Sequence, residues 1–226
     1  MLPRKFVLPC LLALAQFLFA SAPANAADAP AWRDKVTAFA AANFKNPAWG
    51  FSHSARDYAL AKSLAATDHV TLDDDVLFAA AYLHDMAAFD TWAEAKREHG
   101  DVAAEKIDIV LAGTDFPTAK LDAVRGAIRT HMFNRDPVSP EARYLHDADA
   151  LDWLGAIGVA RMIALVDPHG GKPLGPDMVK GIEANLAAVP SRVFSPAGKA
   201  QVAPRIAEEK AFLDALRRET DGYATF

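Results

Sequence analysis

Apolar residues recur at helical spacing through almost the whole chain beyond residue 30, and this pattern constrains the fold more than any other feature. The sequence is rich in alanine, and no alternating apolar–polar run is long enough to indicate a strand. Ser139 with Pro140 is typical of a helix start, and Gly113 is typical of a helix end. The pattern predicts an all-α, single-domain helical bundle with helices at about 31–44, 54–67, 73–88, 92–112, 118–132, 140–166, 177–187 and 197–218.

The first 26 residues have the three-part layout of a secretory signal peptide. Arg4 and Lys5 precede an apolar run from Phe6 to about Ala20, and "ANA" at 24–26 is a small-x-small cleavage site. A transmembrane anchor is the alternative, but a run of roughly 15 residues is short against the ~20 that a bilayer needs. We expect cleavage after Ala26, a helical domain at 27–226, a periplasmic or secreted protein and no lasting membrane anchor.

The net charge and the cysteine content limit the possible partners and metal ligands. The formal net charge of −5 disfavours nucleic acid as a partner. The only cysteine, Cys10, lies inside the predicted signal peptide, so the remaining chain can form neither a disulfide nor a thiolate metal site. Any bound metal must therefore have nitrogen and oxygen ligands.

Two similar phrases, "YLHDMAAFD" at 82–90 and "YLHDADALD" at 144–152, each place a histidine directly before an aspartate. Their flanking sequences share no period, which indicates two unrelated helices rather than a duplicated unit. The first phrase is apolar around nearly the whole helix circumference, so it predicts a central helix. Burying His84 beside Asp85 is costly unless something pairs with them. A divalent cation would supply that pairing, and an inert hydrogen-bonded pair is the alternative.

Other polar residues in apolar helical surroundings are further candidates. His53 stands at a loop-to-helix start, His131 closes a helix, and three acids lie within one long helix at Asp147, Asp149 and Asp152. A single bundle can bring them together with His84 and Asp85. The other histidines are interpreted as structural or surface residues, namely His69, His99, His146 and His169.

The order His53 … His84-Asp85 … Asp149 resembles the H…HD…D signature of the HD-domain metal-dependent phosphohydrolase superfamily. "HSARDYALAKSLA" is similar to that family's first-histidine helix, and "AAYLHDMA" to its dyad helix. "DADALDWLGAIGVAR" resembles the DADxLDxxGAIGxAR stretch of a branch of small bacterial HD hydrolases. The likeness covers most of residues 45–218 and implies an HD-type bundle with a metal site between central helices.

Residue by residue, the resemblance implies four metal ligands: His53, His84, Asp85 and Asp149. Asp147 is the alternative to Asp149, because on one helix the two side chains point about 200° apart and cannot easily face one metal. His131 is similar to an extra histidine that, in relatives, faces the phosphate or a second metal.

Arg56, one turn after His53, could meet a phosphate oxygen, and a surface or salt-bridged arginine is the alternative. Two features depart from the family's pattern: Asp57 stands where an apolar residue is common, and these hydrolases rarely carry a signal peptide.

The resemblance predicts hydrolysis of a phosphomonoester or nucleotide-like phosphoester with a divalent cation, either Mn, Fe, Co, Ni, Zn or Mg. The expected partner is a small phosphorylated substrate. Asp147, Asp152 or the metal's own water could serve as general base. One alternative is an HD-like ligand-binding or sensor protein without catalysis. Another is an oxidative two-metal site, for which His131 and His146 are the nearby additional histidines.

Overall fold

The computed structural model describes residues 31–166 and 175–226, and it confirms the all-α prediction. The predicted signal peptide at 1–26 and the loop that carries His169 lie outside the described residues. The described chain folds into helices and connecting turns without a strand. Its helices are α1 (Ala31–Asn43), α2 (Phe51–Thr67), α3 (Asp74–Leu83), α4 (His99–Lys106), α5 (Asp108–Leu111), α6 (Leu121–Thr130), α7 (Pro140–Asp152), α8 (Gly155–Val166), α9 (Gly175–Ala188) and α10 (Pro196–Glu219), with short 3₁₀ turns η1 (Met86–Ala88), η2 (Thr118–Lys120) and η3 (Val189–Arg192).

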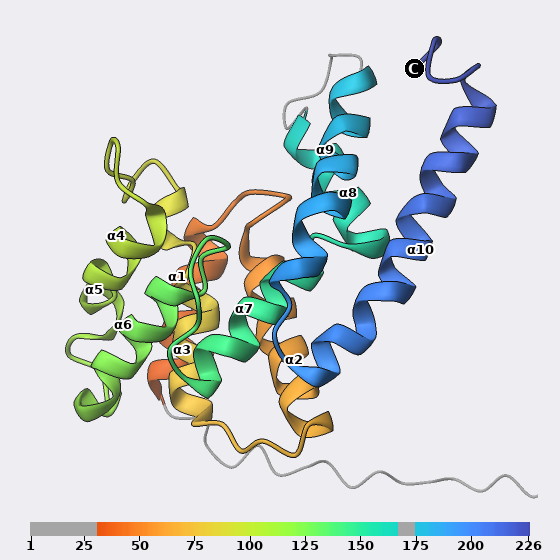
Figure 1. Cartoon of the computed structure of the whole chain (residues 1–226). Helices are drawn as coiled ribbons and strands as arrows, with labels where there is room; N and C mark the ends of the chain where they lie inside the picture. The colour runs from red at the N-terminus through yellow and green to blue at the C-terminus, as the bar shows by residue number, and fades with distance from the viewer. Residues whose placement is uncertain (1–30, 167–174) are drawn as a thin grey trace, which may run out of the picture.

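The helices α1 to α7 form the main bundle, and α8 to α10 extend from it (Figure 1). Every residue from Val76 to Leu83 in α3 is buried, so this helix is central, as its all-round apolar sequence predicts. It packs against α1, α2, α6 and α7. A second apolar cluster, which includes Met162, Met178 and Leu213, joins α8, α9 and α10. The bundle thus surrounds α3, whose C-terminal end carries His84 and Asp85.

Side-chain caps fix the starts of several helices. Asp73 accepts hydrogen bonds from the amides of Asp75 and Val76 at the start of α3. Ser139 accepts one from Ala142 at the start of α7, where Pro140 is the first helical residue, as predicted. Such caps satisfy amides that have no partner within the helix.

Three of the predicted helices are interrupted. The predicted helix 73–88 ends at Leu83 and is followed by η1, and 92–112 begins only at His99, after turns that include Lys96 with φ +66°. The predicted helix 140–166 is two helices, because the chain reverses at Gly155 with φ +73°. A Cβ on Gly158 would lie 2.4 Å from the Trp153 carbonyl oxygen, so the turn also requires a second glycine.

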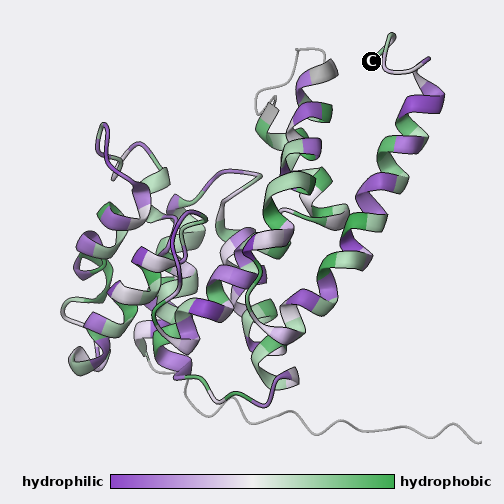
Figure 2. Ribbon diagram, in the orientation of Figure 1, coloured by the Kyte–Doolittle hydropathy of each residue, from purple (hydrophilic) through white to green (hydrophobic). Residues whose placement is uncertain are grey.

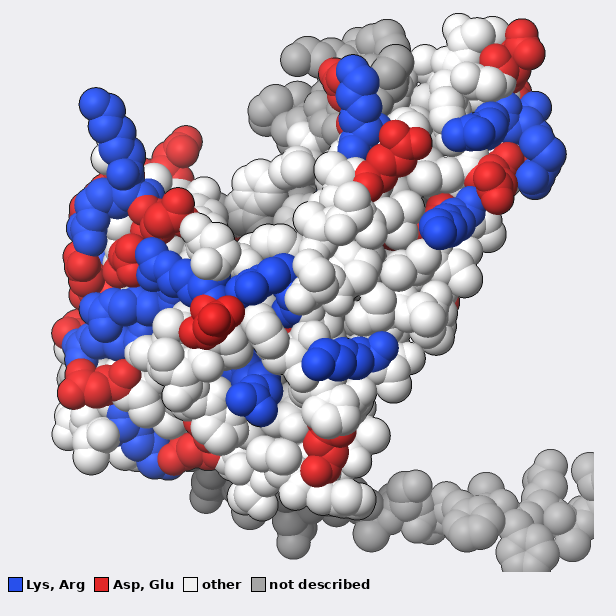
Figure 3. Space-filling model, viewed as in Figure 1, with Lys and Arg blue, Asp and Glu red and all other residues white. Residues whose placement is uncertain are grey.

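The outer faces of the helices are polar and of mixed charge. Figure 2 shows hydrophilic and hydrophobic residues alternating along α10. On the face shown in Figure 3, acidic and basic side chains are interleaved over α4 to α6, with a largely uncharged band beside them. Among the described helices, none combines the length and the apolar character needed to cross a membrane.

Glu209 is an unpaired acid buried between α10 and α8. Its side chain is 0% exposed, and neither carboxylate oxygen has a hydrogen-bond partner within residues 31–166 and 175–226. Burial, together with the charge of Glu208, raises its pKa to about 7. The folded protein therefore holds a proton at Glu209 over a pH range in which the unfolded chain has lost it.

We predict that this carboxyl makes folding stability fall as pH rises from about 4.5 to about 7, and that Glu209→Gln removes this fall. The sign follows because the native state binds more protons than the unfolded state over that range. Above it the charged form is buried, so the variant should be more stable than the parent by roughly 1 kcal/mol or more. Thermal unfolding of both proteins across this pH range is the measurement. Glu183→Gln, at an exposed site, is the control, and parallel curves for parent and Glu209→Gln would contradict the prediction.

Candidate metal centre

Three helices bring the four predicted ligands together at one point. His53 comes from α2, His84 and Asp85 from the end of α3, and Asp149 from α7. The Nε2 atom of His53 lies 3.5 Å from Asp85 Oδ2 and 3.4 Å from Asp149 Oδ1. Asp85 Oδ2 is also 3.3 Å from His84 Nε2. The His53 ring nitrogen is therefore close to both carboxylates, one of which also lies beside His84, from sequence positions nearly 100 residues apart.

Each histidine of the site directs the same ring atom inward. Backbone carbonyls can only accept, so His84 Nδ1–H donates to Ala81 O at 2.8 Å and His131 Nδ1–H donates to Ile128 O. His53 Nδ1–H donates to Asp152 Oδ2 at 2.8 Å. In the neutral rings that bind metals, these bonds place the hydrogen on Nδ1 and leave the Nε2 lone pairs directed into the site. His84 Nε2 is buried and has no hydrogen-bond partner in the part of the chain that the structure describes, which fits a ligand atom.

A break in the helix lets His84 and Asp85 face the same point. Successive side chains on a regular helix diverge by about 100°. Here α3 ends at Leu83, His84 remains helical, and Asp85 adopts φ −94° and ψ 10°. With this turn, the Oδ2 atom of Asp85 lies 3.3 Å from the Nε2 atom of His84.

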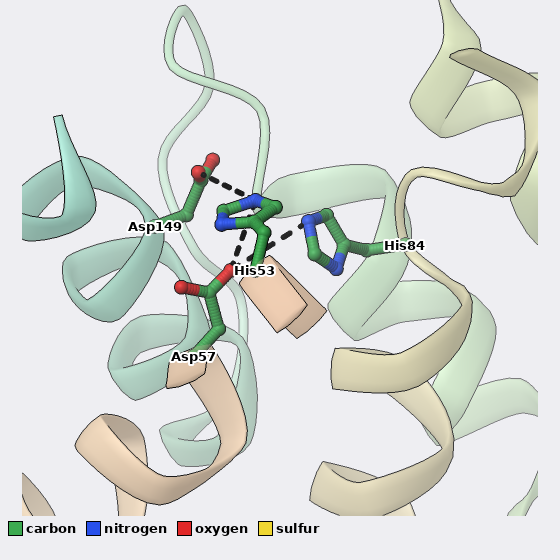
Figure 4. Close-up of side chains that lie close together, drawn as sticks. All are labelled: His53, Asp57, His84 and Asp149. Carbon is green, nitrogen blue, oxygen red and sulfur yellow. Dashed lines mark ion pairs between the residues drawn. The ribbon is translucent and has the colours of Figure 1, made fainter. Parts of the chain in front are cut away.

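Asp57 is a fifth side chain of this cluster, and the ligand prediction did not include it. It lies one helical turn after His53 and is 0% exposed. Its Oδ2 atom is 3.2 Å from His53 Nε2 and 3.8 Å from His84 Nε2 (Figure 4). The i, i+4 spacing from His53 was the signal that could have located it.

Asp152 supports the site from outside. Besides His53, it accepts two bonds from Arg56, Nε to Oδ1 at 2.9 Å and Nη2 to Oδ2 at 2.8 Å. It also accepts one from Arg161 Nη1 at 3.1 Å, and Arg161 Nε donates to the Ala48 carbonyl. Arg56 therefore has the salt-bridged position that was the alternative for it, and the lining of the adjacent cavity, given below, does not include it. Arg161 is 2% exposed and was not predicted as a site residue.

Two candidates from the second "YLHD" phrase lie away from this cluster. Asp147 accepts hydrogen bonds from the backbone amides of Phe194 and Ser195, at 2.8 and 2.6 Å. His146 Nε2 donates to the Arg192 carbonyl at 2.9 Å. Both side chains therefore anchor the segment that precedes α10, and of the two alternatives it is Asp149 that lies beside His53.

A second pair of histidines lies on the other side of Asp85. Its Oδ1 atom is 3.2 Å from His99 Nε2 and 3.9 Å from His131 Nε2. The sequence interpretation treated His99 as structural, because it did not foresee that α4 begins there. The neighbouring Gly100 packs closely against Met132, where a Cβ would lie 2.9 Å from that side chain. One carboxylate thus meets histidines on both of its oxygens.

The clustered charges shift each other's pKa values. Burial lowers the pKa of His84, but the Asp85 carboxylate outweighs it and raises the value to about 9. Burial and the charge of His84 lower the pKa of His131 to about 3. Burial raises the pKa of Asp57 to about 7. His131 is therefore a neutral imidazole at ordinary pH.

A cavity of about 230 Å³ opens beside the cluster. Its lining joins polar site residues with aromatic ones, namely Trp49, Asp85, Ala88, His99, His131, Met132, Phe133, Asp149, Trp153 and Arg161. A second, more apolar cavity shares Phe133, Asp149 and Trp153 with it and continues to Met162, Leu165 and Asn185. The site can therefore take a ligand with one charged and one apolar end.

Comparison with known proteins identifies the architecture. Residues 50–154, which include all five clustered side chains, match the family model described as the HD domain. The fold is that of an HD domain. Among curated proteins, none matches the sequence.

Solved structures agree with this assignment of the HD fold. An HD-superfamily hydrolase from Bacillus thuringiensis is 23% identical, with a TM-score of 0.61, and the match covers 84% of this chain and 96% of that one. A protein described as a predicted HD-superfamily hydrolase, from an uncultured Thermotogales bacterium, is 22% identical with a TM-score of 0.59, covering 84% and 93%. Bacillus subtilis YpgQ in complex with ADP is 18% identical with a TM-score of 0.63, covering 84% and 99%.

Proposed function

We propose that this HD-domain protein is a metal-dependent phosphohydrolase acting on a phosphomonoester or nucleotide-like phosphoester, with a divalent cation held by His53, His84, Asp85 and Asp149. The observation that carries the proposal is the approach of both carboxylates to His53 Nε2, and of Asp85 to His84 Nε2, beside an open cavity. Neutral imidazole and carboxylate are suitable ligands for divalent transition metals. When bound there, such a cation would lower the pKa of a water ligand and offset the negative charge of a phosphate.

His131 is placed to accept a hydrogen bond from a group in the cavity. Its Nδ1–H is engaged by the Ile128 carbonyl, so the neutral ring presents a lone pair at Nε2 toward the cavity. In this tautomer it can accept a hydrogen bond but cannot donate one to a phosphoryl oxygen. Because its pKa is lowered to about 3, we propose that it orients a water or a substrate hydroxyl and does not take up its proton.

Arg161 is better placed than Arg56 to supply positive charge to the substrate. It lines the cavity, and its guanidinium is fixed by Asp152, by the Ala48 carbonyl and by the Trp153 ring, whose centre is 3.7 Å from Cζ. A fixed cation in a water-poor site stabilises phosphoryl charge without having to reorganise. Arg56 instead acts on the site through Asp152.

The shape of the cavities favours a nucleotide-like substrate. Trp153 and Phe133 border both the polar cavity and its apolar neighbour, so a phosphate near Asp149 and a planar group farther in could be bound together. Asn185 borders the apolar part, and its amide nitrogen has no hydrogen-bond partner among the described residues, which would suit a hydrogen-bonding ring. The solved complex of YpgQ with ADP supports this choice for a protein of the same fold.

We further propose that the protein acts in the periplasm or is secreted, on the basis of its predicted signal peptide at 1–26. Outside the cytoplasm, the enzyme would act on phosphorylated compounds that reach the periplasm or the medium. The intact mass of the protein recovered there tests the proposed cleavage after Ala26.

The test of function is turnover of a nucleotide panel and an aryl phosphate by the purified protein, with Mn²⁺ supplied and after chelation. We expect phosphate release that depends on the metal and is faster with nucleotides, because the apolar cavity is filled only by the larger substrates. Metal binding without hydrolysis of any substrate would instead support the ligand-binding or sensor alternative.

A further inference from the structure

Asp57 is a buried carboxylate whose oxygens have no hydrogen-bond partner. It is 0% exposed, and both of its oxygens are unpaired within the described structure. Burying such a group without a partner is costly, and buried carboxylates are ordinarily paired or bound to a metal. The surrounding side chains therefore have to show what Asp57 faces.

The atoms nearest to Asp57 are the proposed ligand atoms. Its Oδ2 lies 3.2 Å from His53 Nε2 and 3.8 Å from His84 Nε2. One donor atom each of His53, Asp57, His84 and Asp149 lie within 4.8 Å of one another. Figure 4 shows the Asp57 carboxylate on α2 directed at the two imidazoles, with Asp149 approaching from α7. A cation that engages both Nε2 lone pairs would thus lie within reach of Asp57.

We propose that Asp57 is an additional ligand of the metal, so that this chain offers two imidazoles and three carboxylates: His53, His84, Asp57, Asp85 and Asp149. The inference rests on the metal centre of the proposed function and adds a donor to it. A third carboxylate makes the site harder and more anionic, which favours oxygen-preferring ions such as Mn²⁺ or Mg²⁺ relative to Zn²⁺.

The charges of the site are consistent with a third carboxylate. Three carboxylates and a divalent cation leave one negative charge, since the imidazoles bind as neutral ligands. The buried guanidinium of Arg161 lies 3.8 Å from Asp149 Oδ1 and supplies the balancing positive charge. Asp152, which also binds Arg161, adds one further negative charge, and its second partner Arg56 balances it, so the cluster with both arginines is neutral overall.

Ligation by Asp57 predicts a loss of metal affinity when the carboxylate is removed. Asp57→Asn removes a ligand, so Mn²⁺ affinity should fall by more than the roughly 10–100-fold that loss of an outer partner causes. A carboxylate that served only the packing of the core would leave the affinity within that range.

The experiment titrates Mn²⁺, and separately Zn²⁺, into the chelated full-length parent, Asp57→Asn and Asp85→Asn, with calorimetric detection. We expect Asp57→Asn to weaken Mn²⁺ more than Zn²⁺. The visible d–d absorption of the Co²⁺-loaded protein should also change, which reports a lost ligand rather than a distant charge. Asp57→Ser, which is smaller, replaces the asparagine variant if that does not fold.

The possible results separate the two proposals. If Asp57→Asn keeps both the Mn²⁺ affinity and the Co²⁺ spectrum of the parent while Asp85→Asn loses binding, the role of Asp57 is refuted and the metal centre stands. If the parent itself takes up none of these ions, both proposals fall.

Discussion

Asp85→Asn is expected to abolish metal binding and phosphoester hydrolysis together. Its carboxylate is the one group that all four site histidines approach, His53 and His84 at Oδ2 and His99 and His131 at Oδ1. An amide keeps the shape but removes the charge and the second acceptor oxygen. We expect metal affinity to fall on the order of a thousand-fold, which corresponds to about 4 kcal/mol.

Metal content, Mn²⁺ affinity and phosphate release are the measurements for this variant, and circular dichroism shows whether it is folded. Asp122→Asn is the matched control, because that side chain is 97% exposed and lies on α6 away from the cavity. A folded Asp85→Asn protein that retained metal and turnover would show that the reaction centre lies elsewhere.

The fold was predictable from the sequence because the local spacing of apolar residues indicates most of the helices. Apolar residues at helical intervals located the helices, and Ser139 with Pro140 marked the start of α7 correctly. The interruptions were harder to predict, because sequences on both sides of a break are themselves helical. In the sequence, Gly155 and Gly158 are the local signal for the break between α7 and α8.

That break also determines which site residues escaped prediction. On a continuous helix, Asp152 and Arg161 would be separated by about 13 Å along the axis and would point in opposite directions. The reversal at Gly155 brings them to 3.1 Å. A prediction of one long helix therefore cannot place Arg161 at the site.

The remaining omissions have different causes. Asp57 could have been found, because its i, i+4 spacing from His53 places both on one helix face. His99 could not, since its approach to Asp85 depends on the non-helical segment 91–98 and on the tight packing of Gly100 against Met132. His53, His84, Asp85 and Asp149 were selected together only through the family resemblance, because no local pattern shows that residues on three helices share one point.

Arg161→Met is expected to destabilise the protein by about 3 kcal/mol, because it removes the buried cation of a carboxylate cluster and breaks ion pairs in the interior. The same carboxylate, Asp152, also binds Arg56, whose side chain is 34% exposed. Arg56→Met should therefore cost about 1 kcal/mol or less. The two variants therefore form a matched pair on one acceptor. Urea unfolding of the chelated proteins measures the difference.

The same pair separates support of the fold from contact with the substrate. Arg161 lines the cavity and Arg56 does not, so kcat/KM for a nucleotide should fall much further in Arg161→Met, measured at a temperature where both variants are folded. If the two substitutions reduced stability and kcat/KM equally, then burial of the Arg161 guanidinium would have no special importance. In that case the positive charge assigned to the phosphate-binding space would have to come from another residue.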